Sequence, residues 1–137
     1  ADWGASARLI VDPDFLRHPI IHRYLGQVLI IGSGSLIHNL PLAGKKMAAN
    51  DMTPYGWEAE YDAWIKQQID SRKIENLINY ETSHTLGKLA SPTPDHYVPV
   101  LYSLGLMDTK DEIKYFYEGI PTIPAFSERS FIIGDGL

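Results

Sequence analysis

The stretch from Gln27 to Asn39 reads QVLIIGSGSLIHN, and the interpretation of the rest of the sequence depends on it. Its first part, Gln27 to Ile31, is a continuous apolar run rich in β-branched residues, which is typical of a central strand buried on both faces. The loop from Gly32 to Ser35 follows and leads to His38. Ligands in open α/β sheets bind beyond the carboxyl ends of strands, so we expect a functional site here.

This glycine-containing loop does not match a phosphate-binding motif. No Lys-Ser or Lys-Thr pair follows the glycines, and no third glycine opens a helix. Glycines at these positions allow the backbone to approach a ligand closely or to adopt a positive φ. The alternative is a tight turn in which His38 is satisfied by backbone groups, which is the commoner outcome for a lone GxG sequence beside a histidine.

The segments around this loop predict a layered α/β domain whose central sheet is mixed and partly parallel. Further strands are expected at three short apolar segments: Ala7–Val11, Lys114–Tyr117 and Arg129–Ile133. Helices are expected near Pro19, within Tyr55–Ile69, within Ser71–Tyr80 with Ser71 as its cap, and ending at Gly105. Leu40 to Pro54 is rich in small residues and turn formers and is expected to be a loop.

The Tyr55–Ile69 segment has the clearest helical periodicity. Its apolar residues recur at steps of three and four: Trp57, Tyr61, Trp64, Ile65 and Ile69. We expect the aromatic members of this face to belong to the core, in preference to a platform on which a substrate stacks.

Chain length, composition, net charge and cysteine content exclude several classes of protein. A chain of 137 residues with 45% apolar and 21% charged residues is expected to fold as one domain. The net charge of −5 and the scattered basic residues argue against nucleic acid as a partner. Because there is no cysteine, any metal must be held by His, Asp or Glu. Without a long apolar run or a signal-peptide pattern, we expect no membrane association and a cytoplasmic location.

A second candidate site lies in the segment SPTPDHYVP, from Ser91 to Pro99. Thr93 is a suitable N-cap and the following proline suits the first helical position, which places His96 in the first turn of a helix. The helix dipole there disfavours a positive charge, so the imidazole is expected to be neutral and able to bind a metal. Pro99 cannot donate a hydrogen bond to Asp95, so either that carbonyl is free or the helix begins later.

The other three histidines are weaker candidates. His18 and His22 have the i, i+4 spacing of a helix face, but Pro19 lies between them and no HExxH motif is present, so a solvated pair is expected. His84 lies in a loop-like stretch and is expected either to reach a site built around Pro92–Tyr97 or to be exposed.

Three blocks together resemble the last half of the class III extradiol ring-cleavage dioxygenases, of the LigB and DOPA-dioxygenase type. These blocks are VLIIGSGSLIHNL (Val28–Leu40), PYGWEAEYDAWI (Pro54–Ile65) and LASPTPDHYVPVLYSLG (Leu89–Gly105), and their order and approximate separation agree with that family. The closing SERSFIIG is similar to the family's final strand. The resemblance extends from about Gln27 to Gly134, and the glycine-His-Asn and PTPDHY blocks are its specific parts.

The resemblance implies a layered α/β/α fold and extradiol cleavage of a catechol, DOPA-like in type, with O₂ at a non-haem metal. It implies Fe(II), with zinc as a possible replacement. His96 maps onto a metal-ligand position, and His38 maps onto a histidine that either binds the metal or acts as the base toward a catechol hydroxyl. Asn39, Tyr97 and His84 are then expected to contact substrate or to orient the histidines.

The family's other metal histidines come from an amino-terminal half that has no counterpart in this sequence. We therefore expect residues 1–137 to form one domain that is the carboxyl-terminal part of a larger catalytic domain. The partners expected are a small aromatic diol and O₂, and the sequence is compatible with an oligomer. Two other hypotheses remain open: a non-catalytic member of the same fold, and a zinc-dependent hydrolase.

Overall fold

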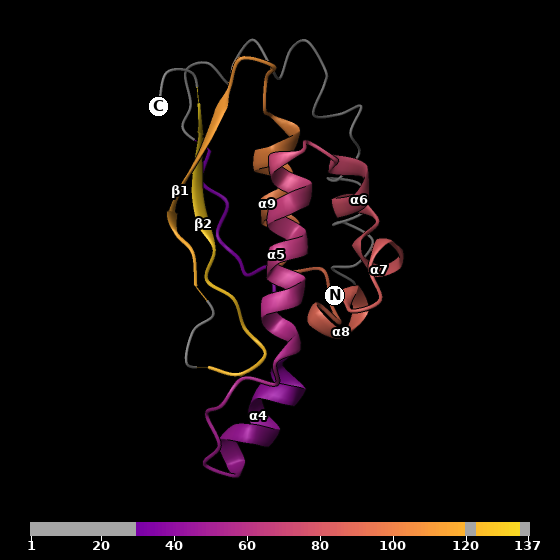
Figure 1. The fold of residues 1–137 in the computed structure, drawn as a ribbon, viewed down its shortest axis with the longest axis vertical. Helices are drawn as coiled ribbons and strands as arrows, with labels where there is room; N and C mark the ends of the chain where they lie inside the picture. Colours follow the sequence, from indigo (N-terminus) through magenta and orange to yellow (C-terminus); the bar gives the residue numbers. More distant parts are fainter. Residues whose placement is uncertain (1–29, 120–122, 135–137) are drawn as a thin grey trace, which may run out of the picture.

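The structure, a computed structural model, describes residues 30–119 and 123–134 (Figure 1). The elements in this part of the chain are, in order, α4 (Leu40–Ala48), α5 (Trp57–Asp70), α6 (Ile74–Ile78), α7 (Tyr80–Ser83), α8 (Gly87–Ala90), α9 (Val98–Gly105), β1 (Glu112–Tyr117) and β2 (Ser130–Gly134). The strand predicted at Ala7–Val11, the helix predicted near Pro19, and His18 and His22 lie outside the described residues.

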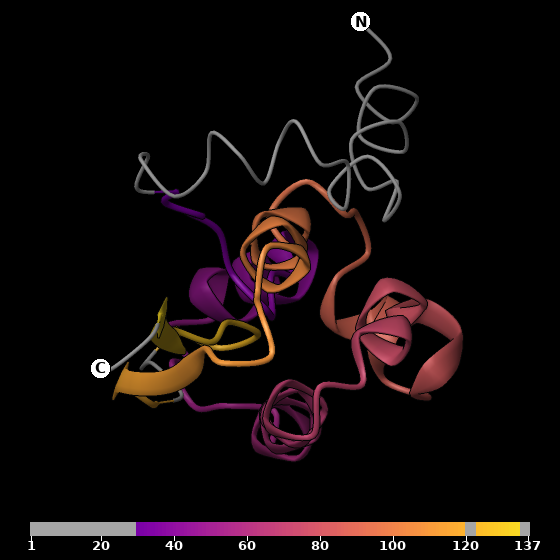
Figure 2. The same cartoon turned by 90° about the horizontal axis from the view of Figure 1, so that it is seen from above.

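The core is enclosed from four sides, as Figure 2 shows: by α5, by α9, by the β1–β2 hairpin and by the group of short helices α6 to α8. Helix α6 contacts both α5 and α9. No helix within the described ranges is long and apolar enough to cross a membrane. The buried apolar residues come from every side and form one cluster: Leu36, Ile37, Tyr61, Ile65, Ile69, Leu77, Tyr80, Ala90, Tyr97, Leu101 and Leu104.

Helix α5 confirms the predicted amphipathic pattern. Tyr61, Ile65 and Ile69 are fully buried, and Trp57 and Trp64 pack against the same cluster while partly exposed. Each fully buried side chain of this size contributes about 1.5–3 kcal/mol to stability by leaving water. The aromatic residues of α5 are therefore core residues, as expected.

The two predicted strands near the carboxyl end form an antiparallel hairpin. Ile113 pairs with Ile133 and Tyr115 with Phe131, and all four side chains pack against the core. The register shifts between Tyr115 and Tyr117, which is a bulge in β1. The predicted partly parallel central sheet is not present among the described residues, where the strand pairing is antiparallel.

The strand predicted at Gln27–Ile31 requires a correction in its described part. Ile30 and Ile31 have no strand assignment, and their side chains are 42% and 79% exposed. A strand buried on both faces needs neighbouring strands and a covering layer, and in the described ranges β1 and β2 pair only with each other. Among the described residues, Ile30 and Ile31 therefore lack the neighbouring strands that their sequence pattern predicts.

The loop predicted for Leu40–Pro54 is also wrong, because α4 occupies its first half. Asn39 caps this helix: its side-chain Oδ1 accepts a hydrogen bond from the Leu42 amide at 3.0 Å. Pro41 lies within the first two helical positions, where its missing N–H is tolerated. The small residues and the proline that suggested a loop are compatible with a capped helix start.

The helix predicted within Ser71–Tyr80 forms, but Ser71 does not cap it. Helix α6 begins at Ile74 after Lys73, and its first residues receive no side-chain hydrogen bond. The Ser71 hydroxyl instead donates to the Gln67 carbonyl at the end of α5. Arg72 then takes a positive φ of 54°, which turns the chain between the two helices.

A buried ion pair joins α5 to the hairpin. The Arg129 guanidinium contacts the Asp62 carboxylate and also pairs with Glu118. The side chains of Arg129 and Asp62 are only 5% and 9% exposed. Breaking a buried pair by removing one partner is costly, because the other charge remains desolvated.

We therefore expect Arg129→Ala to lower the free energy of unfolding by about 3–5 kcal/mol. The measurement is urea denaturation followed by tryptophan fluorescence. Lys66→Ala is the control, because it removes the more exposed pair with Asp70, which is expected to contribute no more than about 1 kcal/mol. Equal losses in the two variants would contradict a structural role for the buried pair.

Candidate functional site

The structure brings the two predicted site histidines together. The rings of His38 and His96 stack with their centroids 3.8 Å apart and their planes inclined by 18°. The edge of Phe126 meets the His38 ring, with a centroid distance of 4.8 Å and an angle of 74°. The predicted convergence of two imidazoles, which are distant in the sequence, is present in the geometry.

Direct backbone contact holds the two histidine-bearing segments against each other. The Ser35 amide donates a hydrogen bond to the His96 carbonyl at 2.8 Å. A Cβ atom added to Gly34 would lie 2.1 Å from that same carbonyl oxygen, and one added to Gly32 would lie 2.7 Å from the Pro99 carbonyl. The two glycines are therefore required for close approach of the segments.

The backbone around His38 is held from two further sides. The His38 amide donates to the Ala90 carbonyl at 2.8 Å. On the other side, His38 and Phe126 form an isolated antiparallel β-bridge. In that bridge the Asn39 amide donates to the Ala125 carbonyl at 3.1 Å. His38 thus lies where three distant segments meet, which restricts where its ring can point.

Asn39 and Tyr97 contact the histidines only through the chain. The Asn39 side chain is almost fully buried, and besides capping α4 it donates to the Leu89 carbonyl at 2.7 Å. Tyr97 is fully buried, and its hydroxyl donates to the Leu77 carbonyl at 3.1 Å. Burial raises the pKa of Tyr97 well above its ordinary value, so its hydroxyl keeps its proton. Each residue anchors the backbone next to its neighbouring histidine.

His84 lies elsewhere. Its ring packs on Tyr61 and Trp64, with centroid distances of 5.4 and 4.9 Å, and its Nδ1 accepts a hydrogen bond from the Leu86 amide at 3.2 Å. The side chain is 17% exposed, so neither an exposed loop histidine nor a member of the His38–His96 pair describes it. These contacts place His84 against α5.

Helix α9 begins later than the preferred prediction placed it. The helix starts at Val98, with Pro99 within its first two positions, and Thr93 is not its cap. Residues 92–97 form turns, in which the amides of Tyr97 and Val98 both donate to the Pro94 carbonyl. His96 therefore precedes the helix and does not lie in its first turn. The cause is the one anticipated, that Pro99 has no amide hydrogen to continue the helix backwards.

The electrostatic surroundings of the pair favour a neutral His38. Burial lowers the pKa of His38 from its ordinary value of 6.5, and the nearby His96 lowers it further. Asp95 opposes this shift. The Asp95 carboxylate lies 3.4 Å from His96 Nε2, and both side chains are about half exposed. A neutral imidazole at pH 7 has a free lone pair, so His38 can accept a proton or bind a metal.

Phe126 is the contact that the sequence did not reveal. It lies in the segment before β2 and carries no motif. The bridge to His38, together with the hydrogen bonds that join the next residue, Ser127, to Ile37 and Ser35, brings it to the site. Phe126 also borders a shallow depression of about 470 Å³, which Gly34 and Ser35 line as well. Neither histidine lines that depression.

The His38–His96 pair alone does not make up a usual metal site. No group of three or more His, Cys, Asp or Glu side chains that could hold a metal ion occurs within residues 30–119 and 123–134. Two imidazoles can supply part of the ligand set of a transition metal, but a typical non-haem iron site uses two histidines and a carboxylate.

Gly34→Ala is expected to lower the free energy of unfolding by about 1–3 kcal/mol, because the new methyl group would overlap the His96 carbonyl. Gly44→Ala is the matched control, since nothing lies within 4 Å of the position of its Cβ atom. This control lies inside α4 and should raise stability by about 0.5–1 kcal/mol. Thermal and urea unfolding of both variants test the prediction, and a neutral Gly34→Ala would contradict it.

We also expect His38 to titrate below pH 6.5 in an NMR pH titration of its imidazole C–H resonances. Asp95→Asn removes a charge that stabilises the protonated ring, so the pKa of His38 should fall further. His96→Gln removes a lowering influence, so the pKa of His38 should rise. Shifts in the opposite directions would contradict the arrangement described.

Comparison with known proteins shows the family of the chain. Residues 18–127 match the family described as the catalytic LigB subunit of aromatic ring-opening dioxygenase. A protein of Escherichia coli K12 named 4,5-DOPA dioxygenase extradiol is 33% identical over 96 residues, which cover 68% of this chain and 34% of that protein. A Beta vulgaris protein of the same name is 36% identical over 78 residues, which cover 57% of this chain and 28% of that protein.

A solved structure agrees with these matches. The crystal structure of an uncharacterized protein from Escherichia coli K12 is similar with a TM-score of 0.57 and 29% sequence identity. The likeness covers 72% of this chain and 40% of that one. The chain spans about a third of the length of the curated relatives that it matches. Since the family match extends over most of the sequence, this chain belongs to the LigB family of aromatic ring-opening dioxygenases, whose fold is of the α/β class.

Proposed function

We propose that this chain is part of an extradiol dioxygenase that opens a catechol ring, DOPA-like in type, with O₂ at a non-haem metal. The observation that supports the proposal best is the stacked His38–His96 pair, which is formed by the two sequence blocks most specific to the family. The names of the relatives, 4,5-DOPA dioxygenase extradiol, support the choice of substrate class.

The ring geometry favours different roles for the two histidines. A metal ion lies in the plane of each imidazole that binds it, along the nitrogen lone pair. Two planes inclined by only 18° and stacked at 3.8 Å do not meet within bonding distance of both rings. In this arrangement one ring can bind the ion while the other stays free. We infer that His96, which is about half exposed, is the ligand and that His38 is the base.

The surroundings of His38 suit a proton acceptor. Its lowered pKa leaves it unprotonated at pH 7, and the backbone contacts on both sides restrict the direction of its ring. In this proposal it takes the proton of a catechol hydroxyl. A bound Fe(II) would acidify that hydroxyl and supply the O₂ chemistry, whereas zinc in its place would only acidify the hydroxyl, because it has no redox chemistry. Positioned bases of this kind contribute about 10²–10⁴-fold to rate.

The proposal also requires that the site be completed by residues outside the described ranges. One or two imidazoles hold iron weakly, and further ligands are needed for a usual site. We infer that the chain is the carboxyl-terminal part of a larger catalytic domain. The exposed Ile30 and Ile31 support this inference, because their apolar run would form a buried strand of a layered, partly parallel sheet only beside additional strands.

The test is anaerobic loading of the purified natural protein, at its full measured length, with Fe(II), followed by catechol or DOPA and then air. A yellow ring-fission product is expected. His96→Ala should lose bound metal and activity, while His38→Ala should keep bound metal and lose about 10²–10⁴-fold in kcat. His84→Ala is the control and should keep both, because its contacts lie against α5.

The outcomes separate the hypotheses. Metal binding without a coloured product would favour a hydrolase, and absence of both metal and product would favour a non-catalytic member of the fold. The intact mass of the natural protein must be measured first, since a larger protein would supply the missing ligands. Full metal content and activity in His96→Ala would show that the site is assigned wrongly.

A further inference from the structure

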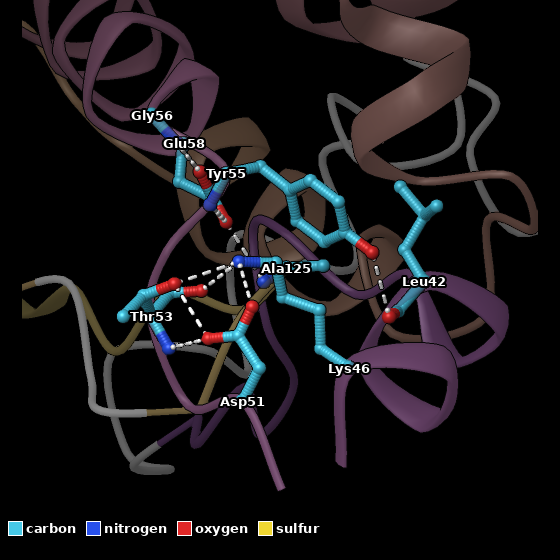
Figure 3. A network of polar contacts seen from close by, with 8 residues as sticks. All are labelled: Leu42, Lys46, Asp51, Thr53, Tyr55, Gly56, Glu58 and Ala125. Atoms are coloured by element: carbon cyan, nitrogen blue, oxygen red, sulfur yellow. Dashed lines mark hydrogen bonds and ion pairs between the residues drawn. The ribbon is translucent and has the colours of Figure 1, made fainter. Parts of the chain in front are cut away.

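A buried carboxylate near the start of α5 gathers three backbone amides. Glu58 is fully buried, and its Oε1 accepts from the Tyr55 amide at 2.9 Å while its Oε2 accepts from the Gly56 amide at 2.8 Å (Figure 3). Oε1 also accepts from the Ala125 amide at 2.9 Å, although Ala125 lies 67 residues later in the sequence. Burial raises the pKa of Glu58, but these amide hydrogen bonds together lower it, so the carboxylate stays charged.

The third of these amides, that of Ala125, belongs to the residue next to Phe126, which contacts His38. Ala125 is fully buried and has a φ of 59°, in the left-handed region that residues with a Cβ rarely adopt. Its carbonyl accepts from the Asn39 amide, and the next residue, Phe126, bridges to His38 and meets its ring edge-on. The conformation of Ala125 therefore sets where the Phe126 ring lies relative to His38.

We propose that Glu58 is a positioning residue for His38: it holds the strained Ala125 turn, and through it fixes Phe126 against the His38 imidazole. This inference rests on the proposed function only for the catalytic role of His38; the positioning of the His38 ring is argued from the contacts alone. It goes beyond that proposal because Glu58 touches neither histidine and belongs to no motif of the site.

Helix capping alone does not account for the contacts of Glu58. A carboxylate near the start of a helix commonly accepts from amides of the preceding residues, which explains the bonds from Tyr55 and Gly56. It does not explain the bond from Ala125. The two roles can be separated, because the cap lies next to Glu58 in the chain and Ala125 is reached only across the fold.

Glu58→Asp makes this separation. Aspartate keeps the charge and is well suited to capping, but its side chain is one methylene shorter, so we expect it to lose the bond from Ala125. The readout is the NMR spectrum of the metal-free chain, with the imidazole C–H resonances of His38 and His84 assigned from His→Gln variants. Phe126→Leu calibrates the experiment, because it removes the aromatic ring whose field acts on His38.

The expected result is that Glu58→Asp moves the His38 resonance in the same direction as Phe126→Leu and leaves His84 unchanged. Glu60→Asp is the matched control on the same helix, with a side chain that is 69% exposed, and should leave the His38 resonance unchanged. Only His38 is compared in this control, because the Glu60 carboxylate lies 4.0 Å from His84 Nε2. An unchanged His38 resonance in Glu58→Asp would overturn the proposal. Equal movement of His38 and His84 would also overturn it, since that indicates general loosening of the fold.

A second variant keeps the test decisive if Glu58→Asp folds poorly. Glycine adopts the left-handed conformation without strain, so Ala125→Gly should restore the His38 resonance in the Glu58→Asp background. Failure of this rescue in a folded double variant would count against the proposal. If the protein turns over catechol, Glu58→Asp should lower kcat more than it changes KM. Without turnover the proposed function fails, yet the NMR comparison still decides the role of Glu58.

Discussion

The hydrogen bond from the Ser35 amide to the His96 carbonyl is the contact on which the site depends. It can form only because Gly34 has no side chain, since a methyl group there would occupy the same space as the carbonyl oxygen. On either side of this contact the chain enters the core, at Leu36 and Ile37 in one segment and at Tyr97 in the other. Two loops are thereby fixed at one junction by groups that carry no chemistry of their own.

Elements with a regular local pattern were predictable from the sequence, and those that depend on distant partners were not. The periodicity of α5 and the alternation in β1 and β2 are visible in short windows, and the structure confirms them. Helix α4 is not predictable from its local sequence, because Pro41 and the small residues are typical of a loop and because Asn39 suits a functional site as well as a helix cap. The strand predicted at Gln27–Ile31 failed at Ile30 and Ile31, since a buried strand is defined by neighbours that a local pattern does not contain.

The same division applies to the site. The meeting of His38 and His96 could be expected from the family resemblance, which places both histidines at one metal-centred site; of the two, only His38 follows a predicted strand. The hydrogen bonds of the Asn39 and Tyr97 side chains could not be predicted, because their acceptors, the Leu89 and Leu77 carbonyls, belong to distant segments. Phe126 contacts His38 because the two residues form a β-bridge between distant segments. The local sequence around Phe126 does not predict this bridge.

The bulge in β1 has a consequence for how the chain behaves in solution. Alternation along the strand points Phe116 outward, where it is 71% exposed, and the bulge after Tyr115 leaves Tyr117 48% exposed beside it. Ile31, at 79%, is a further large apolar group exposed to water, while the exposed charges of Lys114 and Glu118 lie two residues from Phe116 on either side. Such surfaces favour self-association as concentration rises. A segment that covers these side chains should therefore reduce self-association of the chain, and so should dilution.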